Sequence, residues 1–87
     1  MHHNLKLIPS YFEPSFRGEK KFEIRFNNDR GFQKGDTVSL LEYDSKKHTV
    51  ESFKYTGRKI EAVITYVTPF EQKEGFVVFG WEPINNM

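Results

Sequence analysis

The chain contains no cysteine. This absence excludes disulfide bonds, thiolate-ligated zinc and cysteine nucleophiles. The chain also lacks any apolar run approaching the ~20 residues that span a bilayer, and its N-terminal stretch has no apolar segment typical of a signal peptide. We therefore expect a cytoplasmic protein that does not enter a membrane.

An excess of charge of one sign is also missing. Thirteen bases nearly balance 12 acids, so the formal net charge is +1 and the total does not indicate nucleic-acid binding. The distribution is uneven, because residues 17–34 carry six bases against three acids and residues 46–59 carry five against one. If these stretches meet in space they form a positive surface; otherwise they are ordinary solvated loops and strand faces.

Aromatic side chains, in contrast, are abundant. They account for 14 of the 87 residues, although the mean hydropathy is only −0.67. Disordered chains are poor in aromatic residues, so this chain is expected to fold. Its mass of 10.3 kDa suits a single domain over residues 1–87. Its core is expected to consist largely of rings, each burying roughly 150–250 Å².

Short apolar or alternating runs predict a mainly β (α+β) domain. Because no strand–helix–strand alternation appears, we expect a small barrel of five to six mostly antiparallel strands with one or two short helices. Residues 60–68 are apolar on both faces, which predicts that this strand closes the barrel and pairs along both edges. The strands are expected at residues 5–8, 20–27, 37–43, 60–68 and 76–81, and a helix at 10–17, with Tyr11, Phe12 and Phe16 facing the core.

The segment that follows the helix is Gly18-Glu-Lys-Lys-Phe-Glu-Ile-Arg25. Its alternation predicts that Phe22 and its apolar partners Ile24 and Phe26 are buried, whereas Glu23 and Arg25 face a solvent-reachable concavity. Arginine offers a planar donor fork for a phosphate or a base edge, and the glutamate could accept from an amino group or orient the arginine. An ordinary exposed ion pair is the alternative. Burial of Glu23 in the core with Phe22 in water would end this site hypothesis.

Gly18, Lys20, Glu23 and Arg25 match the G-x-K-x-x-E-x-R signature of ASCH domains, in the PUA-like superfamily. The chain resembles one branch of that superfamily over nearly its whole length, a branch of small single-domain bacterial and phage proteins of unassigned function. The further segments that carry the resemblance are His3–Lys6, Tyr11-Phe12, Asn28–Arg30, Gly35-Asp36, Glu42–Asp44, Tyr55–Arg58 and Gly75–Val78.

The resemblance implies a pseudo-barrel with a cleft beside the first helix and the strand that follows it. It further implies that this cleft binds RNA or a nucleotide. The residues that would line the cleft are Lys20, Glu23 and Arg25, with Asn28 and Arg30 at its rim and Tyr55 and Arg58 closing the other side. Tyr55 would offer a ring on which a base could stack. We expect a monomer or a weak homodimer.

Two other functions stay open. Some ASCH proteins resemble amidohydrolases that act on acylated cytidine, with a threonine nucleophile at the position of Glu23. A small nucleoside or nucleotide hydrolase using Lys20 and Glu23 is therefore the first alternative, although a carboxylate forms an acyl-enzyme less readily than an activated hydroxyl. A phage-derived adaptor that binds proteins is the second. We expect no cofactor and no metal, because His2, His3 and His48 have no closely spaced further ligand.

Overall fold

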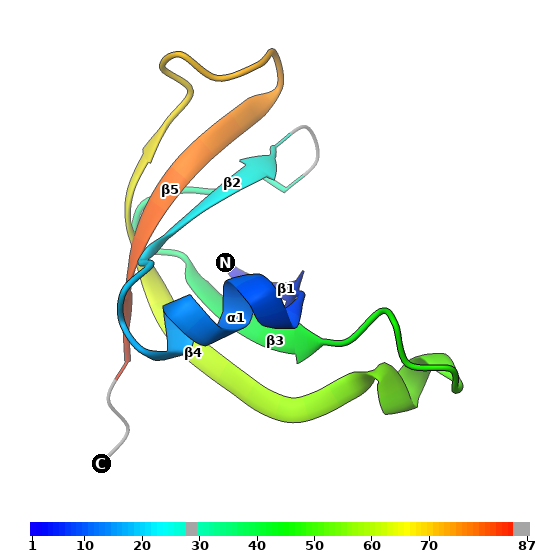
Figure 1. The fold of residues 1–87 in the computed structure, drawn as a ribbon. Coiled ribbons are helices and arrows are strands. Elements are labelled where there is room, and N and C mark those ends of the chain that lie inside the picture. The colour runs from blue at the N-terminus through cyan, green and yellow to red at the C-terminus, as the bar shows by residue number, and fades with distance from the viewer. Residues whose placement is uncertain (28–29, 85–87) are drawn as a thin grey trace.

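The computed structural model describes residues 1–27 and 30–84 (Figure 1). Within these ranges the chain forms five strands, one α-helix and one 3₁₀ helix. The elements are β1 (His2–Leu7), α1 (Pro9–Phe16), β2 (Phe22–Phe26), β3 (Thr37–Tyr43), the 3₁₀ helix η1 (Glu51–Lys54), β4 (Tyr55–Thr68) and β5 (Phe76–Pro83). The mainly β composition predicted from the sequence is confirmed.

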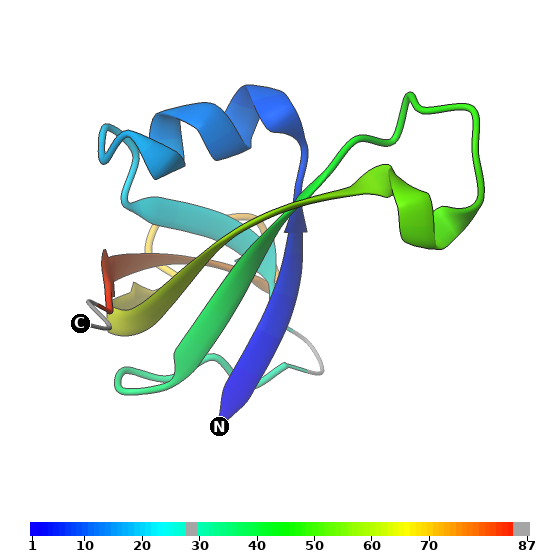
Figure 2. The same cartoon turned by 90° about the horizontal axis from the view of Figure 1, so that it is seen from below.

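All five strands belong to one sheet in the order β1-β3-β4-β5-β2, and only the β1–β3 pairing is parallel. As predicted, β4 pairs on both edges: Tyr55–Val63 face β3 and Ala62–Thr68 face β5. A register shift between Ile64 and Tyr66 bends β4, so one strand serves both halves of the sheet. The sheet curls into a half-barrel and does not close, since β1 and β2 do not pair with each other in the described ranges (Figure 2). The expectation that residues 60–68 close a barrel is therefore wrong, because β1 and β2 stay apart at the open edges.

The hydrophobic core fills the inside of this curl. Its largest fully buried side chains are Trp81, Phe12, Phe79, Leu40, Ile64 and Val38. Phe12 is the aromatic residue through which α1 packs on the core, whereas Tyr11 and Phe16 are exposed, which corrects the expectation that all three face inward. Within the described ranges, neither helical segment is long and apolar enough to cross a bilayer.

Strand β2 faces the opposite way from the prediction, and this outcome rules out the site in the form that the alternation predicted. Phe22, Ile24 and Phe26 are 45%, 55% and 49% exposed, whereas Glu23 is only 4% exposed. Alternation defines the two faces of a strand but does not say which is covered. Here β5 already supplies Val77, Phe79 and Trp81 to the core. The inward side of the edge strand β2 meets charged side chains and the edge of β1 instead.

Candidate functional site

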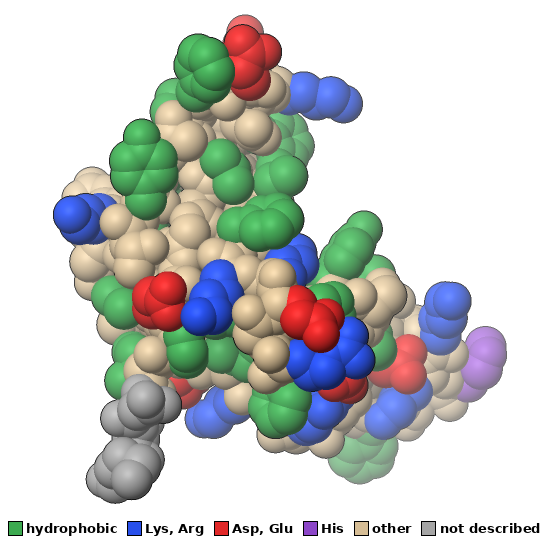
Figure 3. Space-filling view, turned by 60° about the vertical axis from the view of Figure 1, so that its left-hand side comes forward, with side chains coloured by type: hydrophobic (Ala, Val, Ile, Leu, Met, Phe, Trp, Pro, Cys, Tyr) green, Lys and Arg blue, Asp and Glu red, His purple; other side chains and the backbone are tan. Residues whose placement is uncertain are grey.

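A groove of about 640 Å³ lies where the half-barrel stays open, between the end of β1, the start of α1 and strand β2. Its size lies within the range of small-molecule sites. The groove contains three basic side chains and one carboxylate, in an otherwise apolar lining: Lys6, Leu7, Ile8, Tyr11, Lys20, Phe22, Glu23, Ile24, Arg25, Phe26 and Phe76. In Figure 3, the molecule is hollowed between an upper part with exposed hydrophobic side chains and a lower part where charged side chains gather.

The inner part of the groove is an ion-pair cluster centred on Glu23. Lys20 Nζ donates to Glu23 Oε2 at 2.5 Å, and Arg25 Nε donates to Oε1 at 3.0 Å. Both carboxylate oxygens are therefore occupied in a buried position. The two cations remain partly accessible, with 20% of the Lys20 and 26% of the Arg25 side chain exposed. Glu23 thus holds two cations at the groove and does not itself present a free carboxylate to a ligand.

Arg25 also bridges the open seam of the half-barrel. Its Nη2 donates to the carbonyl oxygen of Lys6 at 2.9 Å, and Arg30 Nη1 donates to the carbonyl oxygen of Asn4 at 3.3 Å. These arginines cover the free edge of β1 with side chains in place of a neighbouring strand. Arg30 itself is not part of the groove lining, so its rim position stays a prediction, and Asn28 lies outside the described residues.

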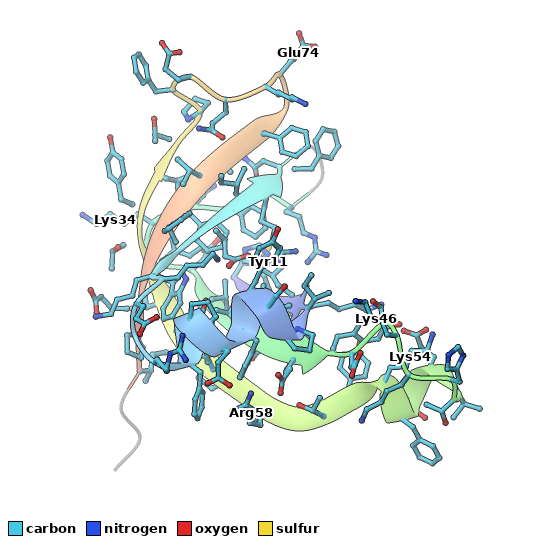
Figure 4. The ribbon with its side chains drawn as sticks, viewed as in Figure 1. Tyr11, Lys34, Lys46, Lys54, Arg58 and Glu74 are labelled. Atoms are coloured by element: carbon cyan, nitrogen blue, oxygen red, sulfur yellow. The ribbon has the colours of Figure 1, made fainter. Side chains whose placement is uncertain are left out.

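Exposed aromatic rings line the mouth of the groove. Tyr11 and Phe22 approach it from α1 and β2, and the Lys20 ammonium lies 5.8 Å and 4.9 Å from the centroids of their rings. Figure 4 shows Tyr11 on the side of α1 that faces β2. Phe26 packs against Phe76 with ring centroids 5.2 Å apart. Partly exposed rings beside cations suit the stacking of planar, anionic ligands.

The structure does not bring Arg58 to this groove. Arg58 binds Glu42 through Nε at 2.9 Å and Nη2 at 3.0 Å, and Nη2 also binds Glu13 at 3.1 Å. Its guanidinium lies 5.0 Å from the ring centroids of both Phe12 and Phe16, on the other side of α1 from Tyr11 (Figure 4). The placement inferred for Arg58 is therefore wrong, because two carboxylates hold it as a clamp between α1 and the sheet.

Tyr55 reaches the groove only through another residue. Its ring packs edge-on against Tyr43, with centroids 4.9 Å apart, and Lys6 Nζ lies 4.5 Å from the Tyr43 centroid and 6.0 Å from that of Tyr55. Lys6 in turn lines the groove. Tyr55 therefore supports a groove residue and is not part of the lining, contrary to the expectation that it closes the cleft.

Two buried carboxylates make the fold sensitive to acid. Hydrogen bonds from Arg58 and then Thr56 hold the pKa of Glu42 below its ordinary 4.5, and the bond to His3 lowers that of Asp36 below 3.8. The stability that such groups contribute is fully present above the ordinary pKa and is lost as the pH falls through the lowered one.

We therefore expect the free energy of unfolding to decrease as the pH is lowered beyond about 4.5. The Glu42→Gln variant is expected to be less stable at pH 7 and to lose less stability on acidification. Urea titrations of both proteins at pH 7 and pH 3 measure this difference. An identical loss of stability in the two proteins would show that Glu42 does not contribute.

Sequence reasoning missed several groove residues, chiefly Lys6, Tyr11, Phe22 and Phe26. Fourteen aromatic residues are many for a chain of 87, and a core of this size leaves some of them at the surface. The large number of aromatic residues was therefore the available signal that some rings lie on the surface. Nothing in the sequence showed which rings stay outside, because this depends on the side of β2 that the sheet covers.

Comparison with known proteins places this chain within a family. A family model described as "Domain of unknown function (DUF3850)" matches residues 2–81, nearly the whole chain. The chain belongs to this family. It is also 41% identical over 66 residues to the "Uncharacterized 12.9 kDa protein in GpA 3'region" of Escherichia phage P2. That alignment covers 76% of this chain and 53% of the phage protein, so the chain spans about half the length of this relative. The domain is therefore a small phage-related one.

Proposed function

We propose that this domain binds RNA, as a short single strand, or a free nucleotide in the groove between α1 and β2. The observation that carries the proposal is the meeting of three basic side chains with exposed aromatic rings in one groove. A nucleotide combines a planar base with an anionic phosphate, and this groove offers a partner for each. The resemblance to ASCH domains supports the same function.

The parts of the ligand follow from the chemistry of the lining. Bases stack on Tyr11 and Phe22. Such stacking does not depend on the base sequence, because every base has a flat aromatic face. Phosphate oxygens accept from Lys20 and Arg25, both held in place by the buried Glu23. The near-zero net charge favours a short strand over nonspecific binding to long duplexes, because duplex affinity comes mainly from neutralised phosphates.

The alternatives have weaker support. A hydrolase with Glu23 as general base needs a carboxylate oxygen that can take a proton from water, yet both oxygens already accept from cations. An adaptor that binds an apolar peptide would suit the exposed row Phe22, Ile24 and Phe26. It would leave the cations of the groove without a role, so an anionic ligand fits the whole lining better.

Removing the two rings tests the proposal directly. Stacking contributes ~1–3 kcal/mol per base, so Tyr11→Ala combined with Phe22→Ala is expected to weaken binding of a short RNA that stacks two bases at least about thirtyfold, and that of a monophosphate with one base at least about fivefold. Isothermal titration with nucleoside monophosphates and short RNAs measures this loss. Tyr66→Ala combined with Phe70→Ala is the matched control, since it removes one exposed tyrosine and one exposed phenylalanine outside the groove. Equal binding by both double variants would contradict the proposal.

A further inference from the structure

The chain between β3 and β4 forms an arm that leaves the body of the molecule. Figures 1 and 2 both show it projecting on one side, with η1 near its tip. Lys46 and Lys47 are exposed and Lys54 is half-buried. Within the described part of the chain, none of these lysines forms an ion pair. Glu51, the arm's other charged residue between positions 45 and 54, is already bound by Lys6 and Tyr43.

The base of the arm is joined to the groove. Lys6 lines the groove and also donates to Glu51 Oε2 at 3.3 Å, and this hydrogen bond raises the pKa of Lys6. A second hollow, of about 340 Å³, lies beside the groove and extends to Lys46. Ile8 lines both the groove and this hollow. The two hollows therefore meet at Ile8, and the second one leads to Lys46, with the carboxylate of Asp44 also in its lining.

The arm also presents apolar groups that the core does not need. Phe53 is 66% exposed and lies beside Lys54 in η1, and Val50 is exposed next to η1. The arm therefore offers cations and an exposed ring on one short segment, as the groove does with Lys20 and Phe22. Single-stranded nucleic acids bind to this kind of surface, where cations follow the backbone and rings receive bases.

We propose that the arm is a second binding segment for the same strand, so that the ligand is an oligonucleotide and not a single nucleotide. The strand leaves the groove past Ile8, its phosphates contact Lys46, Lys47 and Lys54, and a base stacks on Phe53. This inference rests on the proposed function of the groove. It adds that affinity grows with the length of the strand.

The test compares ligands of two lengths on two matched variants. One variant replaces Lys46, Lys47 and Lys54 by glutamine; the control replaces Lys34, Lys59 and Lys73, which lie outside the groove, and so removes the same charge. Figure 4 shows Lys34 on the body, well away from Lys46 and Lys54. Fluorescence anisotropy is measured with a dinucleotide and with a strand of about ten nucleotides, as RNA and as DNA, over a salt series.

We expect the wild type to bind the longer strand at least tenfold more tightly than the dinucleotide. The arm variant should lose this gain, and the slope of log affinity against log salt should fall by about 2, for three single-strand phosphate contacts. Dinucleotide binding should not change, and the control should behave as the wild type. If the protein binds only RNA or only DNA, the arm variant should lose the gain from length with that nucleic acid.

The failures of the two proposals are distinguishable. Wild-type protein that binds the dinucleotide but gains nothing from length would overturn the role of the arm and leave the groove in place. The same conclusion follows if the arm and control variants bind the long strand equally well. Wild-type protein that binds neither length would overturn both proposals.

Discussion

Replacing Phe79 by alanine is expected to lower the free energy of unfolding by ~3–5 kcal/mol, the usual cost of truncating a fully buried phenylalanine. Phe79 is 0% exposed, and its ring centroid lies 5.0 Å from that of Phe32 in the core. A domain of this size has a total stability of ~5–15 kcal/mol, so the variant is expected to be close to unfolding. Urea unfolding followed by tryptophan fluorescence at Trp81 measures the loss.

Phe22→Ala is the matched control for this experiment. Its strand pairs with the strand of Phe79, where Glu23 lies opposite Phe79, yet the Phe22 ring faces the groove. We expect its removal to change stability by about 1 kcal/mol or less, as for other half-exposed positions. A larger loss for Phe22→Ala than for Phe79→Ala would mean that β2 has the opposite face covered, and would remove Phe22 from the groove.

Replacing both Arg25 and Arg30 by alanine is expected to weaken binding of a nucleotide or short RNA by a hundredfold or more. Each charge-assisted hydrogen bond contributes ~1.5–3 kcal/mol, and two such losses reach that factor. Because Arg25 also holds Glu23 and the Lys6 carbonyl, some loss of stability is expected. Titrations are therefore run well below the melting temperature of each protein.

The control for the arginine pair is Arg17→Ala combined with Lys34→Ala. In the described ranges, neither side chain lines the groove or bonds to β1 as Arg25 and Arg30 do, and Arg17 pairs only with the exposed Glu19. The net charge therefore falls equally while the groove stays intact. The control should bind as the wild type does, with the same decrease at higher salt. Equal weakening by both double variants would indicate a general charge effect and contradict specific contacts by Arg25 and Arg30.

The strands could be predicted because their signals are local. The alternation over 20–27 and the apolar run over 60–68 correspond to β2 and β4, and the pairing of β4 on both edges followed from its two apolar faces. The helix predicted over 10–17 corresponds to α1 within one residue at each end, because Gly18, whose φ is +79°, follows it where a left-handed residue ends a helix. These features depend on residues close together in the chain.

The composition of the site was only partly predictable. Lys20, Glu23 and Arg25 do meet at the groove; the alternation predicted a shared face for Glu23 and Arg25 only, and Lys20 was expected there only from the resemblance to ASCH domains. Glu23 faces inward, however, because two cations and the edge of β1 replace an apolar environment there. Arg58 was placed wrongly, since its partners Glu42 and Glu13 are 16 and 45 residues away in sequence.

The sequence by itself determined a small mainly β domain, its strands, its helix and the charged segment beside the helix. Only the tertiary structure decided which face of β2 is covered, where Arg58 lies, and that Lys6 and Tyr11 reach the same groove as Lys20. The physical reason is that periodicity depends on each strand alone. The covered face depends on what the neighbouring strands supply, and here β5 fills the core and leaves the rings of β2 to the groove.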